Sequence, residues 1–278
     1  MPSTQAPVVL ITGSTDGLGK LVALELARQG ATVLLHGRDA AKGAALLGEL
    51  VALTGNTRVR YYNADLASLA QVRDLAQRIR INEPRLDVLV NNAGVGPIAP
   101  GLPRRLSADG HELLFAVNYL AGFLLARELL PLLKAQGSAR IIKVASIGQQ
   151  ALEFDNLMLV RDYDDARAYR QSKLAQILDT FTLAAELKDS GVTVNCLHPA
   201  TLMNTKMVHE GTGYFPGVKS TTEQGADALL RLIVDPALAA VTGRYYDGKV
   251  EARANEQAYN NEARQHLLQA SLQLCKLN

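Results

Sequence analysis

The sequence contains no tryptophan and only two cysteines among its 278 residues. Cys196 and Cys275 lie far apart and outside any CxxC motif, so the sequence predicts neither a disulfide framework nor a thiolate metal site. The five histidines show no HExxH or other ligand spacing, and we expect no metal. We interpret His111 and Glu112 as a solvated helix start.

A strong excess of either charge is also lacking. The formal net charge is +2, and the basic residues are dispersed, which argues against a nucleic-acid partner. The N-terminus does not resemble a signal peptide, and no stretch approaches the roughly 18 apolar residues that span a bilayer. With 48% hydrophobic and 20% charged residues, the chain is expected to be globular, soluble and cytoplasmic.

Short apolar runs bounded by glycine or polar residues recur along the chain, each about as long as a buried parallel strand. Between them apolar residues recur at helical spacing. This alternation predicts an α/β fold, a Rossmann-type doubly wound parallel sheet with helices on both faces, formed by residues 1–278 as a single domain. A last helix is expected from about Glu256 to Lys276. The predicted strands are Val8–Thr12, Thr32–His36, Arg58–Asn63, Asp87–Asn91, Ala139–Ala145 and Val192–His198.

A glycine-rich segment, TGSTDGLG at residues 12–19, follows the first predicted strand and opens a helix. Gly13 permits a sharp turn, Gly17 lets the backbone approach a pyrophosphate, and Gly19 allows close packing, while the helix N-terminus offers N–H groups to an anion. Three glycines alone could form a structural turn, but their place between strand and helix favours phosphate binding. The predicted contacts are Gly13, Ser14, Thr15, Asp16, Gly17, Leu18 and Gly19.

The residues at the end of the second predicted strand indicate which nicotinamide cofactor the site would prefer. An NAD-selective site places Asp or Glu there to hold the ribose 2′-hydroxyl, whereas this chain has His36-Gly37-Arg38. A guanidinium can pair with a 2′-phosphate, so Arg38 favours NADP(H) over NAD(H). Replacing Gly37 by Asp in addition to Arg38 by Ala is expected to shift the preference toward NADH. The alternative is that Arg38 only solvates a loop before the next helix.

Two pairs of residues satisfy a Tyr-x3-Lys pattern. Tyr169 and Lys173 lie in a long amphipathic segment, where the spacing i and i+4 places both side chains on one helix face and lets the cation lower the pKa of the phenol. Tyr245 and Lys249 enclose an Asp-Gly turn signal, which makes a helix there unfavourable. We therefore expect Tyr169 to transfer the proton in carbonyl reduction, and Tyr245→Phe to have almost no effect.

These motifs, in this order, resemble those of the short-chain dehydrogenase/reductase family, and most closely its retinol-dehydrogenase-like branch and bacterial relatives. The resemblance spans nearly the whole chain. Ala200 departs from the family, where many members have glycine after the proline of the last motif. The matching pieces are TGSTDGLG, Asp65-Leu66, Asn91-Asn92-Ala93-Gly94, Val117-Asn118-Tyr119, Ser146, Tyr169 with Lys173, and Leu197-His198-Pro199.

The resemblance implies catalytic roles for four residues. Tyr169 would be the general acid-base, Ser146 would hydrogen-bond the substrate oxygen, Lys173 would bind the nicotinamide ribose and tune Tyr169, and Asn118 would hold a water for proton relay. Taken alone, Ser146 could be a strand-end cap and Asn118 a buried polar residue of a helix.

The resemblance also implies cofactor contacts beyond the glycine loop. Asp65 and Leu66 would lie at the adenine, Pro199 would shape the nicotinamide pocket, and Thr205 would make an amide contact. The turn formed by Asn92, Ala93 and Gly94 would line the cleft, while Asn91 would brace the sheet.

The implied activity is the NADP(H)-dependent interconversion of a ketone or aldehyde with its alcohol. Reduction of a carbon-carbon double bond, as in the related protochlorophyllide reductases, and a non-catalytic NADP(H)-binding sensor are the alternatives. The eukaryotic members often carry a membrane anchor, which the N-terminus of this sequence does not resemble.

Three further expectations concern the surroundings of the site. The insertion at residues 149–165 is expected to border the substrate mouth, and residues 201–219 to form a lid. The apolar helices around Asn118–Leu133 and Ala166–Lys188 are expected to join copies of the chain into a homodimer or homotetramer. The alternative is that the insertion or the C-terminal helix covers the same surface and leaves a monomer.

Overall fold

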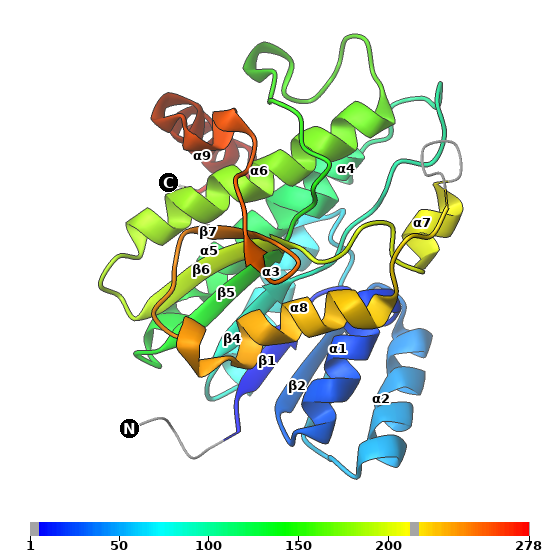
Figure 1. Cartoon of the computed structure of the whole chain (residues 1–278), viewed down its shortest axis with the longest axis vertical. Helices are drawn as coiled ribbons and strands as arrows, with labels where there is room; N and C mark the ends of the chain where they lie inside the picture. Colours follow the sequence, from blue (N-terminus) through cyan, green and yellow to red (C-terminus); the bar gives the residue numbers. More distant parts are fainter. Residues whose placement is uncertain (1–5, 212–216, 278) are drawn as a thin grey trace.

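The computed structural model describes residues 6–211 and 217–277. Within these residues eight strands form one sheet in the order β3-β2-β1-β4-β5-β6-β7-β8 (Figure 1). All neighbouring strands are parallel except β7 and β8, which are antiparallel. This order is the doubly wound one, and it confirms the predicted Rossmann-type fold. The strands are β1 Val8–Ile11, β2 Thr32–Gly37, β3 Val59–Asn63, β4 Val88–Asn91, β5 Ala139–Val144, β6 Val192–His198, β7 Arg244–Asp247 and β8 Val250–Glu251.

Helices cover both faces of the sheet. Helices α1, α2 and α8 pack on one face, and α3, α5, α6 and α9 belong to the core on the other, where α9 lies against α6 (Figure 1). The α-helices are α1 Gly17–Arg28, α2 Ala40–Thr54, α3 Leu69–Asn82, α4 Leu113–Phe115, α5 Ala121–Lys134, α6 Asp165–Glu186, α7 Lys206–Glu210, α8 Thr222–Val234 and α9 Asn261–Leu274. The π-helical turn η1 spans Ala116–Leu120, and the 3-10 turns are η2 Phe154–Asn156, η3 Pro236–Leu238 and η4 Glu256–Tyr259.

The strands are apolar because successive side chains enter two different cores. In β2, Leu34 packs with α3 and α5, whereas Leu35 packs with α1 and α2. A parallel sheet covered on both faces requires such unbroken apolar runs, which is why the first six strands were predicted to within about one residue at each end.

The last part of the sheet was not predicted. Strand β7 contains two buried tyrosines between Arg244 and Asp247, which is too short a pattern to identify a strand. Gly248 has φ 57° and makes the turn into β8, consistent with the predicted Asp-Gly turn. The expected last helix is divided into η4 and α9, because the Asn260 side chain caps a new helix by accepting from Ala263 N at 3.0 Å.

The expectation that no segment is long and apolar enough to cross a membrane is wrong for one helix. Residues Leu113–Lys134, which run through α4, η1 and α5, meet the criteria of length and composition. Most of this helix is buried, and Leu120, Leu124 and Leu125 are inaccessible to solvent in the core that also contains α3 and α6. Its apolar character is therefore that of a core helix.

The apolar surface expected to join copies of the chain is covered by the chain itself. Phe181 of α6 is 8% exposed and contacts the ring of Tyr259 at a centroid distance of 5.4 Å. The Tyr119 hydroxyl is 2.7 Å from that of Ser271 in α9. The C-terminal part of the chain thus packs against these helices, which is the covering considered as the alternative.

Candidate active site

One deep cleft lies at the carboxyl ends of the strands, where the strand order reverses between β1 and β4. Ligands of doubly wound sheets bind at this topological switch point. The cleft has a volume of about 1060 Å³, at the upper end of the range for small-molecule sites. The predicted residues that line it are Gly13, Thr15, Asp16, Gly17, Leu18, Gly19, Arg38, Asp65, Leu66, Asn92, Ala93, Gly94, Ser146, Tyr169, Lys173, Pro199 and Thr205.

The glycine loop is clamped against the turn that follows β4. The Asn92 side-chain amide donates to the carbonyls of Thr12 at 2.8 Å and Gly13 at 3.1 Å. Gly13 has φ 64°, and a Cβ there would lie 2.8 Å from Ala93 Cα. A Cβ at Gly19 would lie 2.4 Å from the Gly13 carbonyl oxygen. Only glycine permits this packing, so the loop and the turn form one backbone-lined cradle.

The Ser14 side chain is outside the cleft, although the sequence marked Ser14 as a cofactor contact. It is fully buried, and its hydroxyl exchanges hydrogen bonds with the His36 backbone, accepting from the N–H at 2.9 Å and donating to the carbonyl at 3.3 Å. This exchange ties the loop to the end of β2.

His36 is a cleft residue that sequence reasoning missed. Its Nδ1 accepts from Gly13 N at 3.2 Å, so the neutral ring carries its proton on Nε2. Burial lowers the pKa of His36 to about 4. Nε2 is buried on the side of the Ala64 backbone, whose hydrogen bond to the ring partly offsets the fall in pKa. His36 is therefore a neutral donor at the floor of the cleft, next to Ala64 and Asp65.

Two exposed cations stand on the rim of the cleft beside β2. Arg38 and Lys42 both line it, and neither side chain has a hydrogen bond or ion pair with another described residue. The Asp39 carboxylate instead caps α2 by accepting from Lys42 N at 3.0 Å. The sequence analysis did not identify Lys42, although its position four residues after Arg38 at a helix start was the available signal.

Three predicted catalytic residues meet on the inner wall. Ser146 follows β5, while Tyr169 and Lys173 come from α6, and the Tyr169 hydroxyl hydrogen-bonds the Ser146 side chain. The Lys173 ammonium lies 5.7 Å from the centroid of the Tyr169 ring and donates to the Val144 carbonyl at 2.8 Å. The i and i+4 spacing thus places phenol and ammonium together, as predicted.

Burial opposes the charged form of both side chains. It raises the pKa of Tyr169, and the hydrogen bond from Ser146 partly offsets that rise. Burial lowers the pKa of Lys173 to about 7. The shift of Lys173 brings its pKa to neutral pH, whereas the rise in the Tyr169 pKa means that the phenol needs a nearby cation or a hydrogen-bond donor to transfer a proton there.

Asn118 does not line the cleft, and its polar atoms are occupied within the chain. It lies in the π-helical turn η1, where its side chain accepts from Val95 N at 2.7 Å and donates to Ser172 Oγ at 2.9 Å. Its backbone carbonyl accepts from the Gln176 amide at 2.7 Å. These contacts match the structural alternative, a buried polar residue that joins the helices to the loop after β4.

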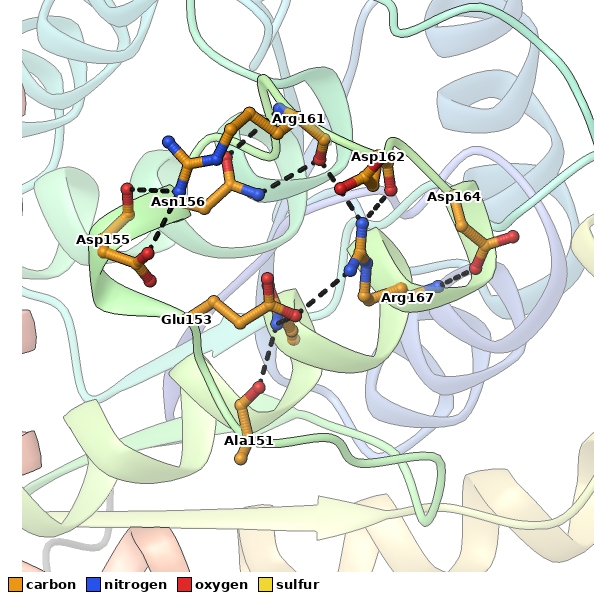
Figure 2. Close-up of polar contacts among 9 residues, drawn as sticks. Ala151, Glu153, Asp155, Asn156, Arg161, Asp162, Asp164 and Arg167 are labelled. Carbon is orange, nitrogen blue, oxygen red and sulfur yellow. Dashed lines mark hydrogen bonds and ion pairs between the residues drawn. The ribbon is translucent and has the colours of Figure 1, made fainter.

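None of residues 149–165 lines the cleft, but Asp165 at the end of the insertion accepts from the N–H of Ile98, which does line it, at 2.9 Å. Figure 2 shows the insertion folded around the start of α6. The Arg167 guanidinium reaches Glu153 Oε1 at 3.3 Å and the carbonyls of Arg161 and Asp162, and Gln171 donates to the Ala151 carbonyl at 2.9 Å. These contacts fix the insertion to the start of the helix that carries Tyr169.

The expectation that Glu112 belongs to a solvated helix start is wrong. Glu112 is 1% exposed and accepts from Phe115 N at 2.6 Å and from the Tyr163 hydroxyl at 3.2 Å. Burial raises the pKa of Glu112, and the backbone and tyrosine hydrogen bonds lower it in part. The carboxylate is a buried helix cap that also holds the end of the insertion.

The expected lid at 201–219 is described except for residues 212–216, which lie outside the described residues. Its helix α7 brings Met207 over the cleft, where a Cβ at Gly96 would lie 2.6 Å from Met207 Cγ. Thr205 is close to the glycine loop, since a Cβ at Gly17 would lie 3.3 Å from Thr205 Cγ2. This segment therefore covers the cleft from the glycine loop to the turn after β4.

Residues 7–212 match the family model for short chain dehydrogenases. The chain belongs to the short-chain dehydrogenase/reductase family. Its relatives place it in the retinol-dehydrogenase-like branch: it is 37% identical to retinol dehydrogenase 13 of Mus musculus, over 97% of this chain and 84% of that protein. It is 35% identical to human retinol dehydrogenase 11, over 97% of this chain and 86% of that protein. Membership in this family makes the chain a hydride-transferring oxidoreductase.

Solved structures show the same fold. An uncharacterized protein from Mycobacterium paratuberculosis superposes with a TM-score of 0.80 at 28% identity, covering 100% of this chain and 96% of the other. The RhlG/NADP active-site complex of Pseudomonas aeruginosa gives 0.71 at 29% identity, covering 88% and 95%. The 3-ketoacyl-(acyl-carrier-protein) reductase of Brucella melitensis complexed with NADH gives 0.70 at 25% identity, covering 90% and 98%.

Proposed function

We propose that this protein is an NADP(H)-dependent oxidoreductase that interconverts a ketone or aldehyde with its alcohol, with Tyr169 as the general acid-base. The observation that carries the proposal is that Ser146, Tyr169 and Lys173 meet on the inner wall of the same cleft whose rim holds the glycine loop and the unpaired Arg38. The residues for chemistry and those for cofactor recognition thus belong to one site.

The cleft fits a dinucleotide. The positions of Gly13 and Gly19 leave no space for a side chain, which keeps backbone open toward the cleft at the N-terminus of α1. The aligned N–H groups of a helix start favour a pyrophosphate there. Asp65 and Leu66 would lie at the adenine, and Pro199 and Thr205 at the nicotinamide end.

The residues of the inner wall supply the proton chemistry. When bound, the nicotinamide supplies or accepts the hydride. The Ser146 hydroxyl orients the carbonyl oxygen, and the Tyr169 hydroxyl gives that oxygen its proton during reduction and removes it during oxidation. Lys173 is buried beside the phenol and would contact the ribose. In its protonated form it would also favour the phenolate. Asn118 would act by holding the loop after β4 in place.

The preference for NADP(H) rests on the charges at the rim. Arg38 and Lys42 are both available to a 2′-phosphate, and no carboxylate takes the place that a ribose 2′-hydroxyl would need at the end of β2. The comparison structures include complexes with both NADP and NADH, so the rim residues carry this part of the proposal.

The proposal is tested with a panel of aldehydes, ketones and enones, including retinaldehyde, assayed with NADPH and with NADH. We expect reduction of carbonyl compounds, with NADPH preferred. Tyr169→Phe should lower kcat by about 10²–10⁴-fold while NADPH affinity stays within a few-fold, because only the proton donor is lost. Enone reduction without carbonyl reduction, or a Tyr169→Phe variant that keeps more than a tenth of the activity, would contradict the proposal.

A further inference from the structure

The backbone carbonyl of Ser146 accepts two hydrogen bonds from outside the strand that ends beside it. The Tyr245 hydroxyl donates to this oxygen at 3.2 Å, and the Gln149 side-chain amide donates at 3.0 Å. Tyr245 is separated from Ser146 by 99 positions in the sequence and comes from β7. The catalytic serine is therefore tied to the far end of the sheet.

Both donors are themselves fixed. Tyr245 is 3% exposed, and β7 pairs with β6 in parallel register, with Tyr245 opposite Cys196. The Gln149 side-chain oxygen accepts from Asn255 N at 2.7 Å, and this segment follows β8. Since each donor has a rigid support, each can hold the Ser146 peptide in one orientation.

The position of the Ser146 backbone determines where the serine hydroxyl lies. Ser146 Oγ accepts from Gly148 N at 3.0 Å, and it is also the hydrogen-bond partner of the Tyr169 hydroxyl. A displacement of the Ser146 backbone would carry Oγ away from Tyr169 and alter its contact with Gly148 N. Displacements of about 1 Å at a reacting group can reduce the rate on the order of 10²-fold.

We propose that Tyr245 and Gln149 are positioning residues that hold Ser146 in the geometry needed to orient the carbonyl oxygen and to stabilise the Tyr169 phenolate. The inference rests on the proposed function. It reverses the expectation that Tyr245→Phe has almost no effect. In this inference, β7 and the segment around Asn255 hold the residues that position the catalytic serine.

The adjacent Tyr246 provides a matched control. It lies in the same strand and is also 3% exposed, but its ring belongs to the core on the opposite face of the sheet, beside Arg231. Tyr245→Phe and Tyr246→Phe each remove one hydroxyl from a buried tyrosine of β7, and only the first hydroxyl reaches Ser146.

The experiment compares Tyr245→Phe, Gln149→Met, the double variant and Tyr246→Phe by kcat, KM for NADPH, melting temperature and the pH profile of alcohol oxidation. We expect each single variant to lower kcat about 3- to 10-fold and the double variant on the order of 10- to 100-fold, with KM for NADPH unchanged. Because the Ser146 hydrogen bond lowers the Tyr169 pKa, the pH of half-maximal oxidation should move upward in these variants but not in Tyr246→Phe.

The outcomes separate this inference from the function on which it rests. If Tyr169→Phe, measured in the same series, is inactive while Tyr245→Phe and the double variant behave like Tyr246→Phe, the positioning role is wrong and the proposed function stands. If kcat falls only in proportion to lost folded protein, with the pH profile unmoved, the contacts are merely structural. If Tyr169→Phe keeps its activity, the proposed function itself fails.

Discussion

The Lys173 ammonium lies 5.7 Å from the centroid of the Tyr169 ring and donates its hydrogen bond to the Val144 carbonyl. The lysine is thus beside the phenol, but its hydrogen bond goes to the strand that precedes Ser146. Burial lowers the pKa of Lys173 to about 7, so the charge of this lysine, and with it the effect of the cation on the phenol, changes with pH near neutrality.

The titration of Lys173 predicts a specific dependence of stability on pH. Its pKa falls from 10.5 to about 7 on folding, so between these values the unfolded chain binds a proton that the folded chain does not. The free energy of unfolding contributed by this group therefore rises with pH through that window and is lost as pH falls toward 7. Relative to Lys173→Met, the wild type should gain on the order of 3 kcal/mol between pH 6.5 and 9.5.

Urea denaturation of both proteins at several pH values measures this difference. Lys173→Met serves as the reference because it keeps a long apolar side chain without a titrating group. Parallel stability curves would mean that Lys173 stays protonated in the folded protein.

Arg38 is predicted to discriminate between the two nicotinamide cofactors. Arg38→Ala should weaken NADPH binding about 10- to 100-fold, equivalent to about 1.5–3 kcal/mol for a charge-assisted contact, with little change for NADH. Fluorescence titration gives both dissociation constants, and Arg28→Ala, at the far end of α1 from the glycine loop, is the control. Equal losses for NADPH and NADH would remove Arg38 as the discriminating residue.

The structure changes the expected result of Gly37→Asp. A Cβ at Gly37 would lie 2.7 Å from Thr15 Cγ2 and 3.1 Å from the Tyr61 hydroxyl. The Thr15 side chain, which belongs to the glycine loop, would have to move to admit the new side chain. A simple shift toward NADH, as the sequence alone indicated, is therefore no longer expected from this position.

Features set by local geometry could be predicted from the sequence. The glycine loop depends on backbone clearance, and the pairing of Tyr169 with Lys173 depends on one helical turn. Each constraint involves residues close in sequence, so the residue types and their spacing carry it.

Features set by the tertiary fold could not be predicted. Ser14 and Asn118 have the residue types of a site, but neighbouring elements occupy their polar atoms. Glu112 has the type of a solvated residue, yet α4 and the insertion bury it. The contact from Tyr245 to Ser146 joins two distant segments, and a tyrosine in a short strand gives no signal of it.

Gly19 is predicted to be essential for the cradle. In Gly19→Ala the new Cβ would lie 2.4 Å from the Gly13 carbonyl oxygen and 2.6 Å from the Asn92 amide. Because the first contact is with a backbone atom, the loop itself would have to move. The affinities for NADPH and NADH should both fall more than about tenfold, because the loop that holds their common pyrophosphate moves.

Gly48 is the matched control for this change. It is an exposed glycine inside α2, and a Cβ there meets nothing within 4 Å. Gly48→Ala should leave both affinities unchanged and stabilise the protein by about 0.5–1 kcal/mol through helix propensity. Cofactor titration and thermal unfolding of the two variants measure the contrast, and a Gly19→Ala variant with normal affinities would show that the cradle can open.

The covering of α6 by the C-terminal segment predicts that this face does not join copies of the chain. The full chain should scatter light as a particle near 29.9 kDa across a micromolar dilution series. Ser271→Glu would place a carboxylate at a fully buried position of α9, beside the Tyr119 hydroxyl, and the cost of burying that charge should detach α9. The variant should melt at lower temperature and self-associate, because the apolar residues of α5 and α6 become exposed.

Gln273→Glu, which adds the same charge at an exposed position two residues later, should remain a monomer. A full-length particle near twice the chain mass, with Ser271→Glu no more associated than Gln273→Glu, would mean that copies of the chain meet through some other surface.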